Sequence, residues 1–415
     1  MSVKQVLLLY LLLAAVSLGT CLDEGTLGPT ARHLTEGSVS PVSNVRADPR
    51  AHCHVARVPV ALAAGQAAKD TIFGQLCLPR GTDHQGVPTV HLVVHSATYS
   101  HLYWGWPYQP ETHSYIKYLV AAGYAVFAFD RIGIGRSSHP PGASVTLDVN
   151  AFVVHQLVRA LRSGAIGKTA FRRVVLVGHS LGSIISLAEA GTYHDVDGVV
   201  LTGISHFSPS GASLLPYFAR ANQDPRFVGR HLDDDYLTTP PGSREASFYS
   251  APLTDPDPRL MALDEATKET VTTAELRTTG SVLTSGASFA IRVPVLMVAG
   301  QFDPEVCGGA PICASLEASA AAFAVAEAPF FAPDACLETV VIQDAGPYLN
   351  LEPTAPVTYA VIRAWSDAHV GVYQAAPPCG PGRMRGGRSP NIRSASFSRA
   401  QSAIVASLFA KESRK

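Results

Sequence analysis

The chain has 415 residues, of which 47% are hydrophobic and 16% charged, and its formal net charge is -1 at pH 7. This composition excludes a disordered protein and describes a chain long enough to bury a large core, as one α/β domain with insertions or as two domains. The near-neutral charge gives no general case for nucleic acid, and we expect no such partner. Eight Lys or Arg but one acidic residue lie in 380–415, so we expect residues 373–415 to form a basic tail.

The N-terminus predicts export. A lone Lys4 precedes an apolar run from Val6 to Leu18, which is too short to span a bilayer, and small residues follow it. We expect residues 1–20 to be a cleaved signal peptide, residues 21–55 to be a leader, and the protein to be secreted without a stable membrane span. A lipoprotein cleavage site before Cys21 is an alternative that Thr20 fits poorly.

Seven cysteines suit an exported protein with disulfide bonds. Cys53 with Cys77 is one candidate pair, and a bridge among Cys307, Cys313 and Cys336 is another. The sequence contains no C-x-x-C pair and no H-E-x-x-H motif, so we expect no zinc site, no other metal and no cofactor.

Strand and helix patterns alternate along the first half of the chain. Runs at 54–60 and 71–78 predict an edge hairpin, and apolar runs at 89–94 and 125–130 predict buried strands. Helical patterns follow at 111–122 and 146–162. This alternation is typical of a mostly parallel doubly wound sheet in an α/β fold.

The pentapeptide Gly178-His179-Ser180-Leu181-Gly182 lies where a strand that begins near Arg173 turns into a helix over 183–190. The glycines lack the Cβ atoms that would collide there, so Ser180 can project its hydroxyl above the sheet edge. The amide of Leu181 then points towards any oxyanion formed at that hydroxyl. We expect Ser180 to be a nucleophile and Leu181 an oxyanion donor; a chance glycine-rich turn is the alternative.

Beyond the pentapeptide, a strand at 198–204 is followed by a long interruption of the strand rhythm. Strands resume at 293–299 and 337–342, and a helix is expected from about 352 to 367. Asp303 follows the first of these two strands, where an acid could fix the tautomer of a histidine. An acidic triplet, Asp233-Asp234-Asp235, lies in the interruption and is either a cation site or a solvated turn.

From about Arg57 to Asp367 the sequence resembles the α/β-hydrolase family. The resemblance rests on the pentapeptide, the loop His95-Ser96-Ala97-Thr98, the turn Asp130 to Ser137, and Asp303. It implies an α/β-hydrolase fold whose core comprises residues 56–206 and 290–372, with a cap inserted at 207–289.

The resemblance also implies roles for single residues. Ser96 and Ala97 would complete the oxyanion hole, and Asp303 would be the triad acid. The family usually has His-Gly where this chain has His95-Ser96, and His95 itself either belongs to that site or makes a structural hydrogen bond. The aromatic stretch that follows either lines a pocket or packs on the sheet; its members are Tyr99, Tyr103, Trp104, Trp106 and Tyr108.

Pro347 stands where the resemblance places the catalytic histidine. A pyrrolidine ring cannot accept a proton, and without a base a serine hydroxyl is a very weak nucleophile. His369 lies at the far end of a helix, about 20 Å away. His206 follows a parallel strand whose carboxyl end opens on the same edge as Ser180. We therefore name His206 as a substitute base; holding the cap is its alternative role.

The sequence thus predicts an exported serine hydrolase that acts on a small-molecule carboxylic ester or lactone, with Ser180, Asp303 and His206 as catalytic residues. Two alternatives remain. The first is a catalytically impaired hydrolase fold kept for binding or regulation, and the second is an acyltransferase that uses the same serine.

Overall fold

The computed structural model describes residues 51–79, 89–208, 211–249, 257–307, 312–314 and 317–372. All of them belong to one unit of contacts that begins at Arg46. The expected signal peptide, most of the leader, and the basic tail lie outside the described residues.

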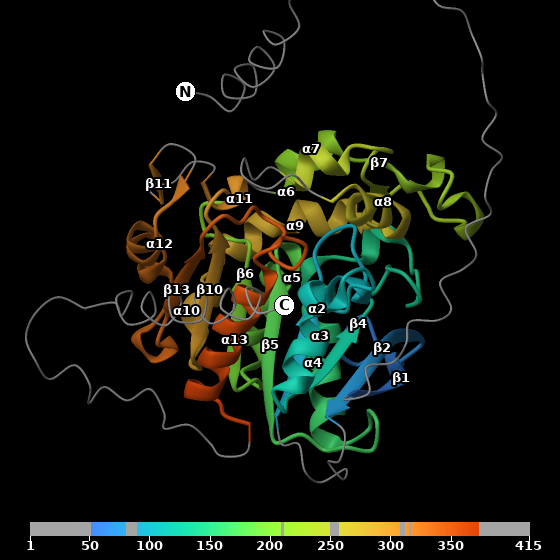
Figure 1. The fold of residues 1–415 in the computed structure, drawn as a ribbon. Coiled ribbons are helices and arrows are strands. Elements are labelled where there is room, and N and C mark those ends of the chain that lie inside the picture. The colour runs from blue at the N-terminus through green and yellow to red at the C-terminus, as the bar shows by residue number, and fades with distance from the viewer. Residues whose placement is uncertain are drawn as a thin grey trace, which may run out of the picture. The chain divides into compact units, whose positions relative to one another are not determined.

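An eight-stranded sheet forms the centre of this unit, with the order β1-β2-β4-β3-β5-β6-β10-β13 (Figure 1). The first two strands, β1 (Ala51–Val60) and β2 (Asp70–Pro79), pair antiparallel as the predicted edge hairpin. The pairs from β4 to β13 are all parallel. These strands are β3 (Thr89–Val94), β4 (Ala125–Phe129), β5 (Arg173–His179), β6 (Gly198–Thr202), β10 (Val295–Gly300) and β13 (Glu338–Ile342). The predicted fold class is confirmed.

Helices cover both faces of the sheet. On one face α4 (Leu147–Ser163) packs against α5 (Leu181–Tyr193), and on the other α3 (Tyr115–Ala121) packs against α13 (Ala355–His369). The β-branched and leucine side chains of the strands are buried between these layers. Gly164 ends α4 with a φ of 78°, a left-handed conformation that glycine adopts without strain.

The helix expected at 111–122 is interrupted. Helix α2 (Pro110–His113) ends at Ser114, and this serine caps α3 by accepting a hydrogen bond from the amide of Lys117. Ser114 also forms an isolated β-bridge with Gly105. Because Ser114 is held extended by both contacts, the helical pattern is split into two helices.

The described residues between β6 and β10 add no strand to the large sheet, and we call residues 203–294 the inserted segment. It contains a small antiparallel sheet of β7 (Ala219–Arg220), β8 (Tyr236–Thr238) and β9 (Val271–Thr272). Its helices are α6 (Gly211–Leu214), α7 (Arg244–Phe248), α8 (Pro258–Thr267), α9 (Thr273–Thr284) and α10 (Ala287–Ala290). A capping box between Thr272 and Glu275 starts α9.

The remaining elements are short. They are α11 (Pro304–Cys307), β11 (Cys313–Ala314), β12 (Glu317–Ala318) and α12 (Ala320–Glu327). The 3₁₀ helices of the described residues are η1 (His101–Trp104), η2 (Gly142–Ser144), η3 (Leu215–Tyr217), η4 (Ala221–Gln223), η5 (Val228–Arg230), η6 (Ala328–Phe330) and η7 (Pro333–Ala335). No helix in the described ranges is both long enough and apolar enough to cross a membrane.

Two sequence alternatives are decided by these contacts. Tyr103, Trp104 and Trp106 are buried in the hydrophobic core together with strand residues, which fits packing on the sheet rather than the lining of a pocket. In the acidic triplet, Asp233 accepts a hydrogen bond from the amide of Gly142 at 2.8 Å, and the other two acids are exposed or partly exposed. The solvated-turn interpretation therefore fits the triplet.

The predicted disulfide between Cys53 and Cys77 is present, with an S–S distance of 2.04 Å. The two residues are direct partners in the β1–β2 register, so the bond joins the edge hairpin. Cys336 is also disulfide-bonded. The other cysteines of the second expected bridge, Cys307 and Cys313, have side chains outside the described part of the chain.

Candidate active site

Ser180 occupies the sharp turn between β5 and α5. Its φ of 49° and ψ of -118° are unusual for a residue with a Cβ atom. The amide of Ser180 donates to the carbonyl of Thr202 at 2.8 Å, and its carbonyl accepts from the amide of Ser183 at 2.8 Å. The strained backbone is therefore held from both sides, by strand β6 and by the first turn of α5.

The two glycines of the pentapeptide are required by close packing. A Cβ atom built on Gly178 would lie 2.4 Å from the Cα atom of Ser183, and one built on Gly182 would lie 2.2 Å from the carbonyl oxygen of Val94. The start of α5 thus presses against the end of β3. Because of this contact, the loop that begins at His95 lies next to the first turn of α5, as an oxyanion hole built from both would require.

His95 fixes the conformation of this loop. The amide of Arg131 donates to Nε2 of His95 at 3.1 Å, so Nδ1 carries the proton and donates to the carbonyl of Ser96 at 2.9 Å. Burial lowers the pKa of His95 to about 3, and the ring is neutral. Of the two roles considered for His95, the structure therefore supports the structural hydrogen bond. Ser96 is buried and Ala97 partly buried in the loop that it holds.

His179 points away from the serine hydroxyl. Its Nδ1 atom lies 2.9 Å from Oγ1 of Thr202, and its ring stacks on Tyr103 with the centroids 4.7 Å apart. Burial lowers the pKa of His179 to about 3. His179 is therefore a packing residue of the turn.

Two carboxyl groups follow β10 beside the serine. Asp303 is fully buried and accepts a hydrogen bond from the amide of Glu305 at 2.9 Å. The hydroxyl of Ser180 donates to Oε2 of Glu305 at 3.4 Å. The acid that is hydrogen-bonded to Ser180 is thus Glu305, and Asp303 contacts the backbone of Glu305.

The environment of the two acids favours their protonated forms. Burial raises the pKa of Asp303 to about 6. Burial and the neighbouring charge of Asp303 raise the pKa of Glu305 to about 8. Two carboxyl groups so close together titrate as a pair, and Glu305 holds the proton that is lost at the higher pH.

His206, which the sequence offers as a substitute base, forms its side-chain hydrogen bonds with groups other than Ser180. Its Nδ1 atom lies 2.5 Å from Oε2 of Glu327, and its Nε2 atom lies 2.7 Å from Oγ of Ser288. The ring also stacks on Phe330, with the centroids 4.0 Å apart. Both ring nitrogens are thus engaged, and His206 joins the start of the inserted segment to α12 and to Ser288 near the end of that segment. These contacts fit the alternative role, in which His206 holds the cap.

Comparison with known proteins identifies the family. The model of the alpha/beta hydrolase family matches residues 92–360, which is more than half of the chain. The chain belongs to the α/β-hydrolase family. A comparison with curated protein sequences gave no match.

Several solved structures are similar to this α/β-hydrolase. An esterase from Thermogutta terrifontis is 18% identical, with a TM-score of 0.50 over 75% of this chain and 97% of the esterase. E-2-(acetamidomethylene)succinate hydrolase is 21% identical, with a TM-score of 0.48 over 76% of this chain and 100% of that one. The enol-lactonase of Burkholderia xenovorans LB400 is 17% identical, with a TM-score of 0.46 over 74% and 100% of the two chains.

In this α/β-hydrolase, the loop that contains Pro347 approaches the turn that carries Ser180. A Cβ atom built on Gly203 would be 2.9 Å from Cε1 of His179 and 3.4 Å from the carbonyl oxygen of Pro347. A Cβ atom built on Gly300, at the end of β10, would be 2.1 Å from the carbonyl oxygen of Gly346. The loop after β13 is therefore packed beside both the serine turn and the acids, with a proline where a base was expected.

Sequence reasoning missed Glu305. The available signal was the tripeptide Asp303-Pro304-Glu305 directly after a buried strand, because it puts two acids at the sheet edge where ligands bind. The sequence pattern gave a role to Asp303 alone, because the acid expected after this strand is the one that orients a histidine.

Proposed function

We propose that this α/β-hydrolase is a serine hydrolase of carboxylic esters or lactones in which Glu305 takes the place of the missing histidine. The observation that carries the proposal is the hydrogen bond from the hydroxyl of Ser180 to Oε2 of Glu305, at 3.4 Å. A serine on a strained strand-to-helix turn projects its hydroxyl for attack, and Ser180 occupies such a turn. A general base must lie within hydrogen-bond reach of the proton that it removes, and Glu305 does so.

In the first step, the ionised carboxylate of Glu305 takes the proton of Ser180 as Oγ attacks the carbonyl carbon of the ester. The carbonyl oxygen becomes an oxyanion, and we assign its stabilisation to the amide of Leu181 with that of Ser96 or Ala97. The C–O bond to the alcohol then breaks, and the alkoxide leaves with the proton from Glu305. The products are an acyl-serine and a free alcohol.

In the second step, Glu305 removes a proton from water, and the resulting hydroxide attacks the acyl carbon. The bond to Oγ of Ser180 breaks, and Glu305 returns the proton to Oγ, so the acid is released and the enzyme is restored. A carboxyl group can serve in both directions because its pKa, raised to about 8, lies close to neutral pH.

Asp303 acts on this chemistry through Glu305. It accepts a hydrogen bond of 2.9 Å from the amide of Glu305, and this bond orients the turn that carries the base. Its negative charge also raises the pKa of Glu305, which makes the Glu305 carboxylate a stronger base once it is ionised. In this proposal Asp303 is a positioning residue rather than the partner of a histidine.

We also propose that the inserted segment, with the expected cap at 207–289, covers the site and shapes the substrate pocket. The protein is exported, which the N-terminal sequence and the disulfide between Cys53 and Cys77 support.

The test is the pH dependence of ester hydrolysis, measured with p-nitrophenyl acetate between pH 5 and 10. The ionised form of Glu305 is the active one, so the rate should rise with pH, reach half of its maximum near pH 8 and level off at higher pH. Ser180→Ala should abolish turnover, and Glu305→Gln should lower kcat about 100-fold or more and remove the pH dependence. Glu338→Gln, the same change at a partly exposed glutamate, is the matched control and should behave as the wild type.

Two results would contradict the proposal. In the first, Ser180→Ala retains the wild-type rate. In the second, Glu305→Gln keeps the wild-type pH profile. Background turnover combined with a ligand-induced increase in Tm would instead identify a binding protein, and ester product from an added alcohol would identify an acyltransferase.

A further inference from the structure

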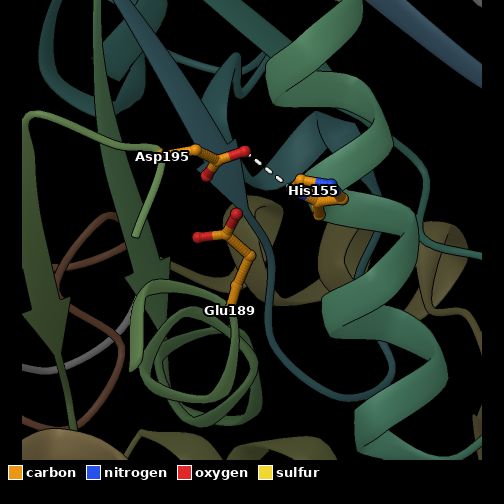
Figure 2. Close-up of side chains that lie close together, drawn as sticks. All are labelled: His155, Glu189 and Asp195. Atoms are coloured by element: carbon orange, nitrogen blue, oxygen red, sulfur yellow. Dashed lines mark hydrogen bonds and ion pairs between the residues drawn. The ribbon is translucent and has the colours of Figure 1, made fainter. Parts of the chain in front are cut away.

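A second group of ionisable side chains lies between α4 and α5. His155 comes from α4, Glu189 from α5, and Asp195 from the loop that follows α5 (Figure 2). One possible ligand atom from each residue can be chosen so that all three lie within 4.8 Å of one another. Nδ1 of His155 is 2.7 Å from Oδ2 of Asp195.

Glu189 is the unusual member of this group. Its side chain is fully buried, and neither carboxylate oxygen has a hydrogen-bond partner. Figure 2 shows its carboxylate directed towards the space between His155 and Asp195. Oδ1 of Asp195 is also buried and unpartnered. A buried carboxylate without a hydrogen bond is costly, so this arrangement requires either a shared proton or a cation.

The nearest basic side chain does not supply that cation. Arg162 donates to the backbone carbonyl of Asp195 at 2.6 and 3.0 Å and to Oδ2 of Asp197 at 2.6 Å. Its hydrogen bonds therefore go to other oxygens. Among the described residues, no Lys or Arg forms an ion pair with Glu189. Burial and the adjacent carboxyl group of Asp195 raise the pKa of Glu189.

One imidazole nitrogen and two carboxylate oxygens make a donor set that suits zinc and related divalent transition metals. Such ions are bound at about 2.0–2.2 Å, so small side-chain rotations would bring the three ligand atoms to a common centre. We propose that His155, Glu189 and Asp195 bind a divalent transition metal of the zinc type, with water completing the coordination. This inference does not depend on the proposed hydrolase activity.

The site would be structural. Glu189 follows Ser180 by nine positions on the chain, which is about 13 Å along the axis of α5. An ion there would join the end of α5 to the middle of α4 and to the loop before β6. It can be reached from solvent, because the side chains of His155 and Asp195 are 18% and 21% exposed.

The experiment uses the full chain with its disulfides intact, treated with EDTA, dialysed, and titrated with zinc chloride by calorimetry. We expect one zinc ion per chain and an increase in Tm of a few degrees at a large excess over Kd. Glu189→Gln and His155→Gln should each weaken zinc binding at least about 10-fold, because each removes a metal ligand. Cobalt(II) in place of zinc should give a visible absorption band that both variants lose.

His369→Gln is the matched control, because His369 also pairs with a carboxylate, Glu338, at 2.8 Å, but belongs to no such group of three among the described residues. It should bind zinc as the wild type does. If Glu189→Gln does not fold, His155→Gln still decides the question, since this side chain is partly exposed. No zinc binding by the wild type, or unchanged affinity in a folded His155→Gln variant, would overturn the inference.

Discussion

The hydroxyl of Ser180 lies beside a carboxyl group, that of Glu305, and the proposed chemistry depends on this pairing. Ser180 and Asp303 could be predicted because each follows a strand at the edge where ligands bind in parallel sheets. Glu305 could not, because its contact with Ser180 depends on how α11 (Pro304–Cys307) turns back after β10. His206 fulfilled the same edge criterion, yet Glu327 and Ser288 occupy its ring nitrogens. The position along the chain indicates the edge but does not give the direction of a side chain.

At the same scale, Gly182→Ala should destabilise the protein. The added Cβ atom would lie 2.2 Å from the carbonyl oxygen of Val94, and backbone on both sides must shift to relieve this contact. We expect a loss of about 1–3 kcal/mol in the free energy of unfolding, measured by urea titration. Gly229→Ala is the control, because nothing lies within 4 Å of its added Cβ atom. Equal stability of the two variants would contradict the close packing described for the turn.

Most strands and helices could be predicted from the pattern of apolar residues, while the contacts between their side chains could not. The apolar runs predicted β3, β5, β10 and β13 because strands buried on both faces are apolar throughout. The helix expected at 111–122 was split because Ser114 caps a second helix. The cluster of His155, Glu189 and Asp195 could not be predicted, since its members come from three segments and form no local motif.

A buried ion pair joins the inserted segment to the core. Arg131, in the turn after β4, pairs with Glu275 in the first turn of α9, and both side chains are fully buried. Asn150 of α4 donates to the same Glu275 carboxylate at 3.0 Å. These contacts tie the inserted segment to two elements of the core.

Glu275→Gln should therefore be strongly destabilising. It leaves the buried charge of Arg131 without its counterion, which costs on the order of 3–5 kcal/mol. The measurement is the free energy of unfolding from urea titration. Glu111→Gln removes the exposed partner of Lys117 and should change this free energy by less than about 1 kcal/mol. A loss for Glu275→Gln no larger than that of the control would show that the pair does not anchor the segment.

In the whole molecule, two regions of α5 have different surroundings. Its start carries Ser180 at the carboxyl ends of the strands, and its later turns carry Glu189, near the loop that leads into β6. The parallel order could be predicted from the alternation of strands and helices, and so could the edge at which the chemistry belongs. Which acid lies beside Ser180 could not be predicted, because the answer depends on how three segments come together: the turn after β5, the turn after β10, and the loop with Pro347.

The most direct test of the Ser180–Glu305 pair is labelling by a fluorophosphonate probe, with the modified residue identified by mass spectrometry. We predict one adduct on Ser180 of the wild-type protein, formed faster at pH 9 than at pH 6, because Glu305 must be ionised to remove the proton. Glu305→Gln should be labelled at least about 100-fold more slowly than the wild type, and Glu338→Gln should be labelled at the wild-type rate. If the wild type is not labelled while a Pro347→His variant is, a histidine is required and the account of Glu305 as the base is wrong.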